Sequence, residues 1–289
     1  MAHKLKVVAI IAPTGMLGSG VYSILKDKYK LVLVYRDEKK VELLQEKYGY
    51  NKNIKFVNFD LTSIIKNSAN FKKLTAKIGK IDAIINCAGI INKYADQNLK
   101  LTFFINSVIP QLLSKYYREK LIQITTDCVF DGQKNFPYDE KAAMSAFDAY
   151  GMSKWLGEPC NSLVLRTSII GNEIATFSSL LEWFKKQNGK TINGYNYCYW
   201  NGITSQQFGK VCDQIISHRK SFPRQGTYHI FSTTLSKYEI LTQFKKKYKL
   251  NIKITKVTKI KCNRALSTVH NLNRKLKIPS FEKMLNELE

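Results

Sequence analysis

Tyr150 and Lys154 are the residues of this 289-residue chain whose types and spacing most directly suggest chemistry. Two side chains four positions apart on a helix lie on the same face of it. There the charge of the lysine ammonium would make the phenol easier to ionise, so that Tyr150 could exchange a proton near neutral pH. Spacing alone decides little, because other pairs share it, among them Tyr22/Lys26, Tyr35/Lys39 and Tyr116/Lys120. The elements around Tyr150 must therefore support the interpretation.

Residues 1–170 alternate short apolar runs with helical stretches, which is the pattern of βαβ units. Uninterrupted Val, Ile and Leu in these runs indicate strands that helices cover on both faces. The sequence thus predicts an α/β fold, a Rossmann-type doubly wound parallel sheet with a smaller C-terminal substrate lobe. The expected strands are residues 6–11, 30–35, 54–59, 81–86, 121–125 and 162–167, and the expected helices are 16–28, 38–48, about 96–117 and one that carries Tyr150.

Beyond Gly171 the sequence changes character. Residues 191–203 are rich in Tyr, Asn and Gly, a helix-like stretch covers 205–217, a strand-like one covers 227–231, and a helix and a lysine-rich strand follow. We therefore expect a Rossmann domain over residues 1–171, completed by parts of 205–235. A smaller substrate-binding lobe is expected over 172–204 and 236–289.

The formal charge of +24 raises the question of a nucleic-acid partner. Only seven of the 46 basic residues are arginine, the residue that best reads bases and phosphates, and dispersed lysine is usually a solvated surface. We expect no nucleic-acid partner, although the positive charge of the protein would attract a small anionic substrate.

No run of about 20 apolar residues is present, the six cysteines are scattered, and the four histidines lack metal-ligand spacing. A cytoplasmic protein without membrane or metal site is expected, and a homodimer is left open.

A glycine-containing turn follows the first strand. It reads Ala12-Pro13-Thr14-Gly15-Met16-Leu17-Gly18. Gly15 would let backbone approach a pyrophosphate, and Gly18 would let the helix pack closely on the strand, with helix amides facing the phosphates. Ala12 stands where such turns have their first glycine, so the turn must tolerate a methyl group. Thr14, Gly15, Met16, Leu17 and Gly18 are the candidate phosphate-side residues of a dinucleotide site.

The ends of the next strands add candidates for the same site. Arg36, at the tip of strand two, would accommodate the 2′-phosphate of NADP, so NADP(H) is favoured and NAD(H) is the alternative. Pairing of Arg36 with Asp37 in solvent is the other interpretation. Strand three ends in an acidic residue that could accept from the adenine amine, and strand four ends in small residues that let backbone pass close to a ribose. These candidates are Asp60, Leu61, Cys87, Ala88 and Gly89.

Several short motifs follow one another in a fixed order: residues 104–106, 125–132, 137–140, 150–158 and 165–168. On these motifs the chain resembles an extended short-chain dehydrogenase/reductase. More narrowly, it is similar to the dTDP-4-dehydrorhamnose reductase group, which reduces nucleotide-activated 4-keto-6-deoxy sugars. That group reads Ser-Thr-Asp-Tyr-Val-Phe-Asp-Gly at positions 125–132, where this chain has Thr125 and Cys128 at the first and fourth places. The likeness is strong to about residue 171 and looser afterwards.

The resemblance implies roles for four catalytic residues. The Thr126 hydroxyl would donate to the substrate carbonyl oxygen and stabilise the developing alkoxide, and Tyr150 would deliver the proton as general acid. Lys154 would bond the nicotinamide ribose and lower the pKa of Tyr150. Asn106 would hold the water or backbone link that replenishes the proton. The resemblance also implies that Lys154 and Arg166 belong to the cofactor-binding residues.

Substrate contacts are implied for the loop after strand five and for the second lobe. Arg264, in an Arg-Pro-x-x-Ser-like element with Ala265 in place of proline, could grip a diphosphate, and Trp200 could stack on a base. A core tryptophan and a surface arginine are the competing interpretations. Together with the loop, the implied substrate residues are Asp127, Cys128, Val129, Phe130, Trp200 and Arg264.

The expected activity is NADPH-dependent reduction of a nucleotide-sugar ketone in deoxysugar and surface-glycan synthesis, with a nucleotide sugar as partner. The sequence leaves the nucleotide open among dTDP, UDP and GDP. A nucleotide-sugar epimerase of the same family is the nearest alternative. A non-catalytic NADP-binding regulatory subunit is the alternative from another class.

Overall fold

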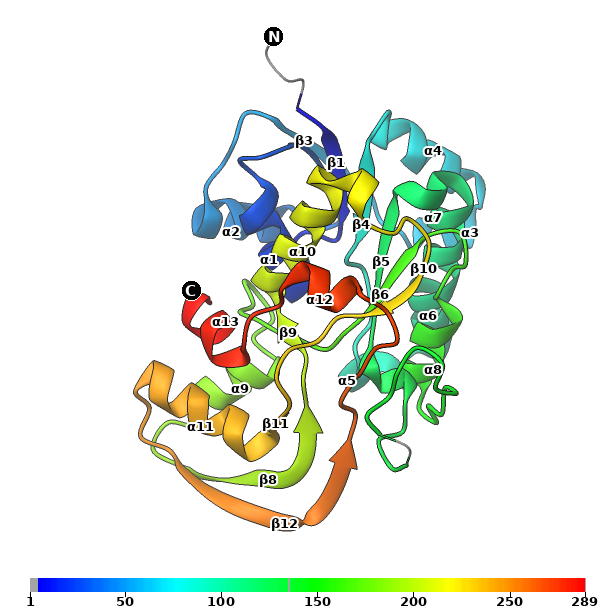
Figure 1. Cartoon of the computed structure of the whole chain (residues 1–289). Coiled ribbons are helices and arrows are strands. Elements are labelled where there is room, and N and C mark those ends of the chain that lie inside the picture. The colour runs from blue at the N-terminus through cyan, green and yellow to red at the C-terminus, as the bar shows by residue number, and fades with distance from the viewer. Residues whose placement is uncertain (1–4, 135, 289) are drawn as a thin grey trace.

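A seven-stranded parallel sheet forms the centre of the computed structural model, which describes residues 5–134 and 136–288 (Figure 1). Its order is β10-β6-β5-β4-β1-β2-β3, so the strand order reverses between β1 and β4. This confirms the predicted Rossmann-type doubly wound sheet. The strands are β1 (Val7–Ile11), β2 (Lys30–Tyr35), β3 (Ile54–Asn58), β4 (Ala83–Asn86), β5 (Leu121–Thr125), β6 (Leu163–Arg166) and β10 (Gly226–His229).

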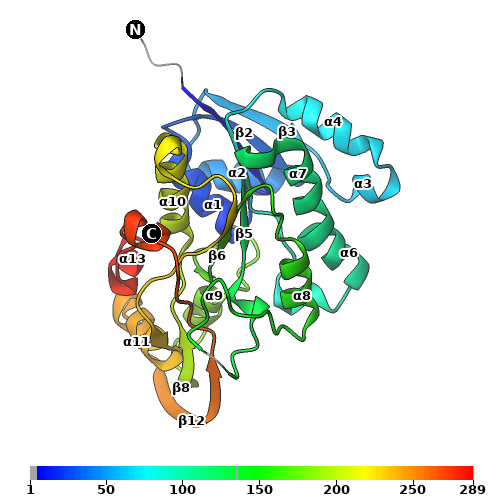
Figure 2. The ribbon, with the colours of Figure 1, turned by 45° about the vertical axis from the view of Figure 1, so that its right-hand side comes forward.

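Alternation along the strands divides the core into two layers. Val8 and Ile10 of β1 pack into one buried cluster, and Ala9 and Ile11 pack into the other. Figures 1 and 2 show α1 and α10 on one side of the sheet and α4 and α7 on the other. The helices of these layers are α1 (Met16–Leu25), α2 (Glu38–Tyr48) and α10 (Ser205–Ser217) on the first side and α4 (Ala69–Ile78), α6 (Leu99–Phe103) and α7 (Ile109–Tyr117) on the second.

A second, three-stranded sheet lies beyond the carboxyl ends of the central strands, at the bottom of Figure 1. Its order is β11-β8-β12, with β8 and β12 parallel and β11 antiparallel to β8. Helix α11 packs against β8. The elements of this region are β7 (Ile169–Ile170), α9 (Leu180–Lys185), β8 (Thr191–Trp200), β9 (Ile203–Thr204), β11 (Leu235–Ser236), α11 (Lys237–Tyr248), β12 (Lys253–Asn263), α12 (Leu272–Leu276) and α13 (Phe281–Glu287).

The remaining elements are short. Two turns of 3₁₀ helix, η2 and η4, close loops at the amino ends of strands, and η3 directly follows β5. No helix within the described residues is both long and apolar enough to cross a membrane. The short helices are α3 (Ser63–Lys66), α5 (Asn92–Ala95), η1 (Phe104–Val108), η2 (Arg118–Lys120), η3 (Asp127–Val129), α8 (Ala149–Leu156) and η4 (Arg219–Ser221).

Candidate active site

The turn after β1 opens onto the amino end of α1. Ala12 has a left-handed backbone, φ +56°, which confirms that this turn must accommodate a methyl group at a position that favours glycine. A Cβ on Gly18 would lie 2.2 Å from the Ala12 carbonyl oxygen, so only glycine lets the helix approach the strand this closely. A Cβ on Gly15 would meet its nearest neighbour only at 3.8 Å. A side chain at position 15 would thus meet no clash, whereas position 18 requires glycine.

A cavity of about 310 Å³, the strand-tip cavity, lies at the carboxyl ends of β1 to β4. It occupies the place where ligands bind in open parallel sheets. The structure brings six of the predicted cofactor residues to its wall. They are Thr14, Arg36, Asp60, Leu61, Ala88 and Gly89.

Arg36 and Asp37 do not pair with each other. The Asp37 carboxylate caps α2 by accepting from the Lys40 backbone N–H at 3.3 Å, and its other oxygen lies 3.9 Å from the Lys40 ammonium. Arg36 is exposed at the cavity rim and has no ion pair among the described residues. Lys40 lines the same cavity. Two cations therefore lie beside the tip of β2, and sequence reasoning had found only one of them.

Lys154 is held on α8, whose start is fixed by the Asp148 side chain accepting from the Gly151 backbone N–H at 2.7 Å. Its side chain is buried, and burial lowers the pKa of the ammonium to about 8, with the neighbouring Cys87 and Glu158 opposing the shift. No hydrogen bond or ion pair from the residues described here reaches this ammonium. A Cβ on Gly89 would lie 3.0 Å from its Nζ atom. A buried, unpartnered cation beside a bare glycine backbone fits a ribose of a dinucleotide cofactor.

Tyr150 and Thr126 lie close to each other across the gap between α8 and the end of β5. Burial, the largest effect, and the nearby Cys128 raise the pKa of the Tyr150 phenol, and the interaction with Thr126 opposes them only in part. This direction is opposite to the lowered pKa that the sequence suggested, because desolvation outweighs the other effects on the phenol. The Thr126 hydroxyl donates to Asp127 Oδ1 at 3.1 Å and accepts from the Cys128 backbone N–H at 3.1 Å.

Asn106 lies in a π-helical turn, η1, that interrupts the long helix expected over residues 96–117. Pro110 follows four residues later and has no N–H to donate to the Asn106 carbonyl, which explains the local change of helix type. Gly157 occupies the space beside that carbonyl, since a Cβ on it would lie 1.9 Å from the oxygen. Single π turns of this kind are frequent at functional sites.

The Asn106 side chain joins α8 to the loop after β4. Its Oδ1 accepts from the Ile90 backbone N–H at 2.8 Å, and its Nδ2 donates to the Ile90 carbonyl at 2.9 Å and to Ser153 Oγ at 3.0 Å. The amide is thus fully engaged in positioning the two segments that carry Gly89 and Lys154. Participation of Asn106 in a proton relay stays a prediction.

A second cavity of about 290 Å³, the lobe cavity, lies between the β5 loop and the second sheet. Asp127, Cys128, Trp200 and Arg264 line it, as the resemblance implied. Arg264 is half-buried, and its Nε donates to the Phe130 carbonyl at 2.9 Å and its NH1 to Cys128 Sγ at 3.5 Å. Its charge also opposes the rise in the Asp127 pKa that burial causes.

Val129 and Phe130 do not reach the lobe cavity. Both side chains are fully buried in a small cluster with Tyr138 and Leu266. The rings of Phe130 and Tyr138 stack with their centroids 4.3 Å apart. The 3₁₀ turn after Thr126 rotates them inward. Their expected role as substrate contacts is therefore replaced by a structural one, in which the Phe130 carbonyl holds Arg264.

Arg166 lies in a buried network instead of facing the strand-tip cavity. Its guanidinium pairs with Glu158 through two hydrogen bonds, of 2.8 and 2.6 Å, and NH1 donates to His229 Nε2 at 3.3 Å. His229 Nδ1 can then donate to the Ser267 carbonyl at 2.8 Å, and burial lowers the pKa of this imidazole. The expected cofactor contact is thus a residue that ties β6 and β10 to the Arg264 segment.

Other predicted residues lie at the borders of these cavities. Gly15, Met16, Leu17 and Gly18 form the first turn of α1, and Cys87 packs beside Lys154, where burial raises its thiol pKa to about 12. Sequence reasoning did not find Lys237, which the first turn of α11 places on the wall of the lobe cavity. No cluster of potential metal ligands occurs in the described part of the chain.

Comparison with solved structures finds the same fold in other proteins. The structure is similar to dTDP-4-dehydrorhamnose reductase from Bacillus anthracis in complex with NADP (19% identity, TM-score 0.75, 99% of both chains). It is also similar to a dTDP-4-dehydrorhamnose reductase from Clostridium acetobutylicum (20% identity, TM-score 0.70, 97% of both chains). A third similar structure is UDP-N-acetylglucosamine 4-epimerase from Methanobrevibacter ruminantium in complex with UDP-N-acetylmuramic acid (14%, 0.75, 98% of this chain and 97% of that one).

No curated protein matches the sequence. A family model does match, over residues 10–268, a stretch that includes the β1 turn, the catalytic candidates and Arg264. The chain therefore belongs to the family described as the RmlD substrate binding domain.

Proposed function

We propose that the protein is an NADPH-dependent reductase of the 4-keto group of a nucleotide-activated 4-keto-6-deoxy sugar. A substrate of the dTDP- or UDP-4-keto-L-rhamnose type, with or without a 2-acetamido group, would serve deoxysugar and surface-glycan synthesis. The observation that carries the proposal is the buried Lys154 ammonium, which has no hydrogen-bond or ion-pair partner among the described residues and comes from the same helix as Tyr150. Lys154 lies beside Gly89, which lines the strand-tip cavity, and Tyr150 lies near Thr126, whose neighbour Asp127 lines the lobe cavity.

The roles follow from the chemistry of the side chains. NADPH would supply the hydride when bound. Thr126 would turn its hydroxyl from Asp127 to the ketone oxygen, and Tyr150, protonated at neutral pH because burial raises its pKa, would donate the proton. Lys154 would hold the cofactor ribose. Arg264, kept in place by the Phe130 carbonyl, would hold the substrate diphosphate.

The two cavities suggest that different parts of the chain bind the cofactor and the substrate. We assign cofactor binding to residues 1–171, completed by parts of 205–235. Substrate binding is assigned to 172–204 and 236–289, with the β5 loop contributed by the first part. The relative from Bordetella bronchiseptica in complex with NAD and UDP, and the Bacillus anthracis relative in complex with NADP, support a nicotinamide cofactor and a nucleotide-linked substrate.

The test is incubation of the protein with NADPH and a panel of dTDP-, UDP- and GDP-linked 4-keto sugars, followed by product analysis by NMR. Stoichiometric NADPH oxidation with formation of a 4-hydroxy sugar would support the proposal. Interconversion of 4-epimers of nucleotide sugars without net cofactor consumption would replace it by an epimerase, a candidate that the similarity to the Methanobrevibacter ruminantium enzyme favours. Cofactor binding without turnover of any nucleotide sugar would indicate a regulatory subunit.

Cofactor preference is expected to depend on Arg36. Its exposed guanidinium has no partner among the described residues and lies at the strand-tip cavity with Lys40, so it is available to a 2′-phosphate. We expect Arg36→Ala to weaken NADPH binding by about 1.5–3 kcal/mol and to leave NADH binding nearly unchanged. Isothermal titration with both cofactors measures this, with exposed Lys39→Ala of the same segment as the matched control. Equal affinity of the wild type for NADPH and NADH would refute the role.

Cofactor binding is also expected to depend on pH through Lys154. The ammonium is charged below its pKa of about 8 and neutral above it, so its bond to a ribose hydroxyl weakens as the pH rises through that value. The 2′-phosphate of NADPH is already ionised there and contributes no change. We expect NADPH affinity to fall several-fold between pH 7 and 9.5, measured by cofactor fluorescence. Lys154→Met should bind weakly with a flat profile, and an unchanged slope in that variant would assign the titration to another group.

A further inference from the structure

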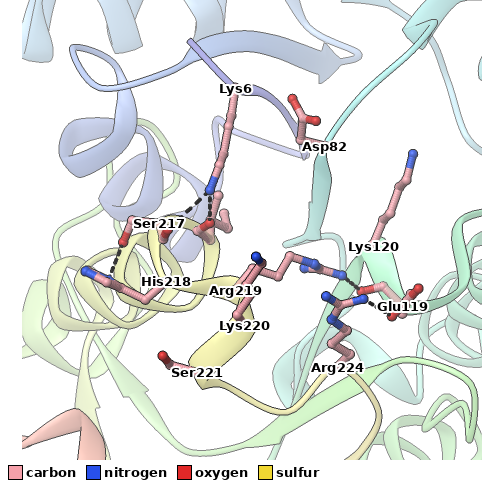
Figure 3. Close-up of a pocket in the computed structure, with 11 residues that line it drawn as sticks. Lys6, Asp82, Glu119, Lys120, Ser217, His218, Arg219, Lys220, Ser221 and Arg224 are labelled. Carbon is pink, nitrogen blue, oxygen red and sulfur yellow. Dashed lines mark hydrogen bonds and ion pairs between the residues drawn. The ribbon is translucent and has the colours of Figure 1, made fainter. Parts of the chain in front are cut away.

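A third cavity, the amino-edge cavity, lies at the opposite end of the central sheet and has a volume of about 590 Å³ (Figure 3). Its wall is formed by the residues that precede β1, β4 and β5 and by the segment after α10. The strand-tip and lobe cavities lie at the carboxyl ends of these strands. A ligand in the amino-edge cavity would therefore not compete with cofactor or substrate.

Arginine gathers at this cavity although it is scarce in the chain. Only seven of the 46 basic residues are arginine. Lysines are so frequent that several are expected near any surface cavity, whereas several arginines close together are not expected from the composition. Arg219 and Arg224 line the cavity, and both interact with Glu119. Arg118 also lies close enough to contribute to lowering the Glu119 pKa. Three of the seven arginines thus surround one carboxylate.

The carboxylates of the wall do not balance its cations. Arg224 NH1 lies 3.0 Å from Glu119 Oε2, while Arg219 donates only to the Glu119 backbone carbonyl. Burial and, next to it, the charge of Arg224 lower the pKa of Arg219. The effect of Arg224 indicates that the two positive charges lie close together. The Asp82 carboxylate accepts from the Val7 backbone N–H at 2.7 Å.

The lysines of the wall add charge, and none of them has an ion pair with a carboxylate of the described residues. Lys6 Nζ donates to the carbonyls of Ile216 and Ser217 at 2.6 and 3.3 Å, and Lys120 Nζ donates to the Ile81 carbonyl at 2.9 Å. Carbonyl oxygens orient these ammonium groups without cancelling their charge. With Lys220, five cations face two carboxylates, an excess of three positive charges in one concavity.

We propose that the amino-edge cavity binds a small, multiply charged anion of the phosphate-ester or polyphosphate class. Planar guanidinium groups bind phosphate oxygens in pairs, and an anion placed between Arg219 and Arg224 would relieve their repulsion. The volume lies within the range of small-molecule sites. This site is independent of the proposed reductase activity, because neither cavity of the reaction contributes to it.

The probe is inorganic pyrophosphate, titrated calorimetrically at low ionic strength into protein saturated with NADP⁺. The double variant Arg219→Gln/Arg224→Gln should raise the pyrophosphate Kd at least tenfold. Lys253→Gln/Lys256→Gln is the matched control, since it removes the same charge from β12, away from the cavity, and should change the Kd less than threefold. Arg264→Gln removes the arginine of the proposed diphosphate site in the lobe cavity, and the pyrophosphate binding that depends on Arg219 and Arg224 should persist in this variant.

Three outcomes would overturn the proposal. Equal weakening in the arginine and lysine double variants would show a general effect of the protein's charge, and complete loss of pyrophosphate binding in Arg264→Gln would place all of it in the lobe cavity. Binding of a single-stranded oligonucleotide that is lost in the arginine variant, without pyrophosphate binding to wild type, would indicate a polyanionic partner instead. Because Arg219 is partly buried, Lys220→Gln/Arg224→Gln, which changes exposed side chains only, repeats the test should the first variant fail to fold.

Discussion

Tyr150→Phe is expected to lower kcat by about 10² or more while leaving NADPH affinity nearly unchanged. The change removes the hydroxyl that would protonate the ketone oxygen but keeps the ring, which packs beside the end of β5. Lys154, the residue expected to hold the ribose, is untouched and has its own position on α8. Burial raises the pKa of Tyr150, so the wild-type phenol keeps its proton across the neutral range and the loss should not vary between pH 6 and 8.

The chain offers a matched control for this variant. Tyr116 also precedes a lysine by four residues, but it lies exposed on α7, on the outer surface of a helix. Tyr116→Phe should therefore retain wild-type kcat. The measurement is steady-state kinetics with saturating NADPH on the substrate that the panel identifies. A Tyr150→Phe enzyme within threefold of wild type would remove Tyr150 from the chemistry.

Much of the lining of the strand-tip cavity could be predicted from the sequence because its geometry is local. A turn after β1 and short motifs at the ends of β2, β3 and β4 are enough, since the carboxyl ends of parallel strands meet at one edge. Thr14, Arg36, Asp60 and Gly89 accordingly line one cavity. The place of Lys40 at this cavity could also have been predicted, because it lies in the first turn of α2, only four residues after Arg36.

The substrate side depends on side-chain directions and distant partners, which spacing does not reveal. A 3₁₀ turn rather than an extended loop follows Thr126, and it turns Val129 and Phe130 into a core cluster. The Arg166 environment is non-local too, since His229 lies 63 residues further along the chain. The π turn at Asn106 could have been expected from Pro110 four residues later, because proline removes the hydrogen bond to that carbonyl.

Glu158→Gln is expected to destabilise the fold by about 3–5 kcal/mol, because it leaves the buried Arg166 charge without its carboxylate. The side chains of Arg166 and Glu158 are 3% and 7% exposed, so water cannot replace the lost partner. Glutamine keeps the shape and one acceptor, which isolates the charge from the packing. The measurement is the free energy of unfolding from urea titration of the protein without ligands.

The matched control is Glu287→Gln, which breaks the Lys210–Glu287 ion pair at 2.8 Å. Those side chains are 40% and 39% exposed, so the expected loss is below about 1 kcal/mol. Equal losses in the two variants would show that the Arg166 network contributes no more than a surface ion pair. Because His229 links Arg166 to the Ser267 carbonyl, the segment that carries Arg264 should loosen first in Glu158→Gln. An increase in hydrogen exchange over wild type that is larger at residues 265–268 than at β1 would show that this network positions the lobe cavity as well as stabilising the sheet.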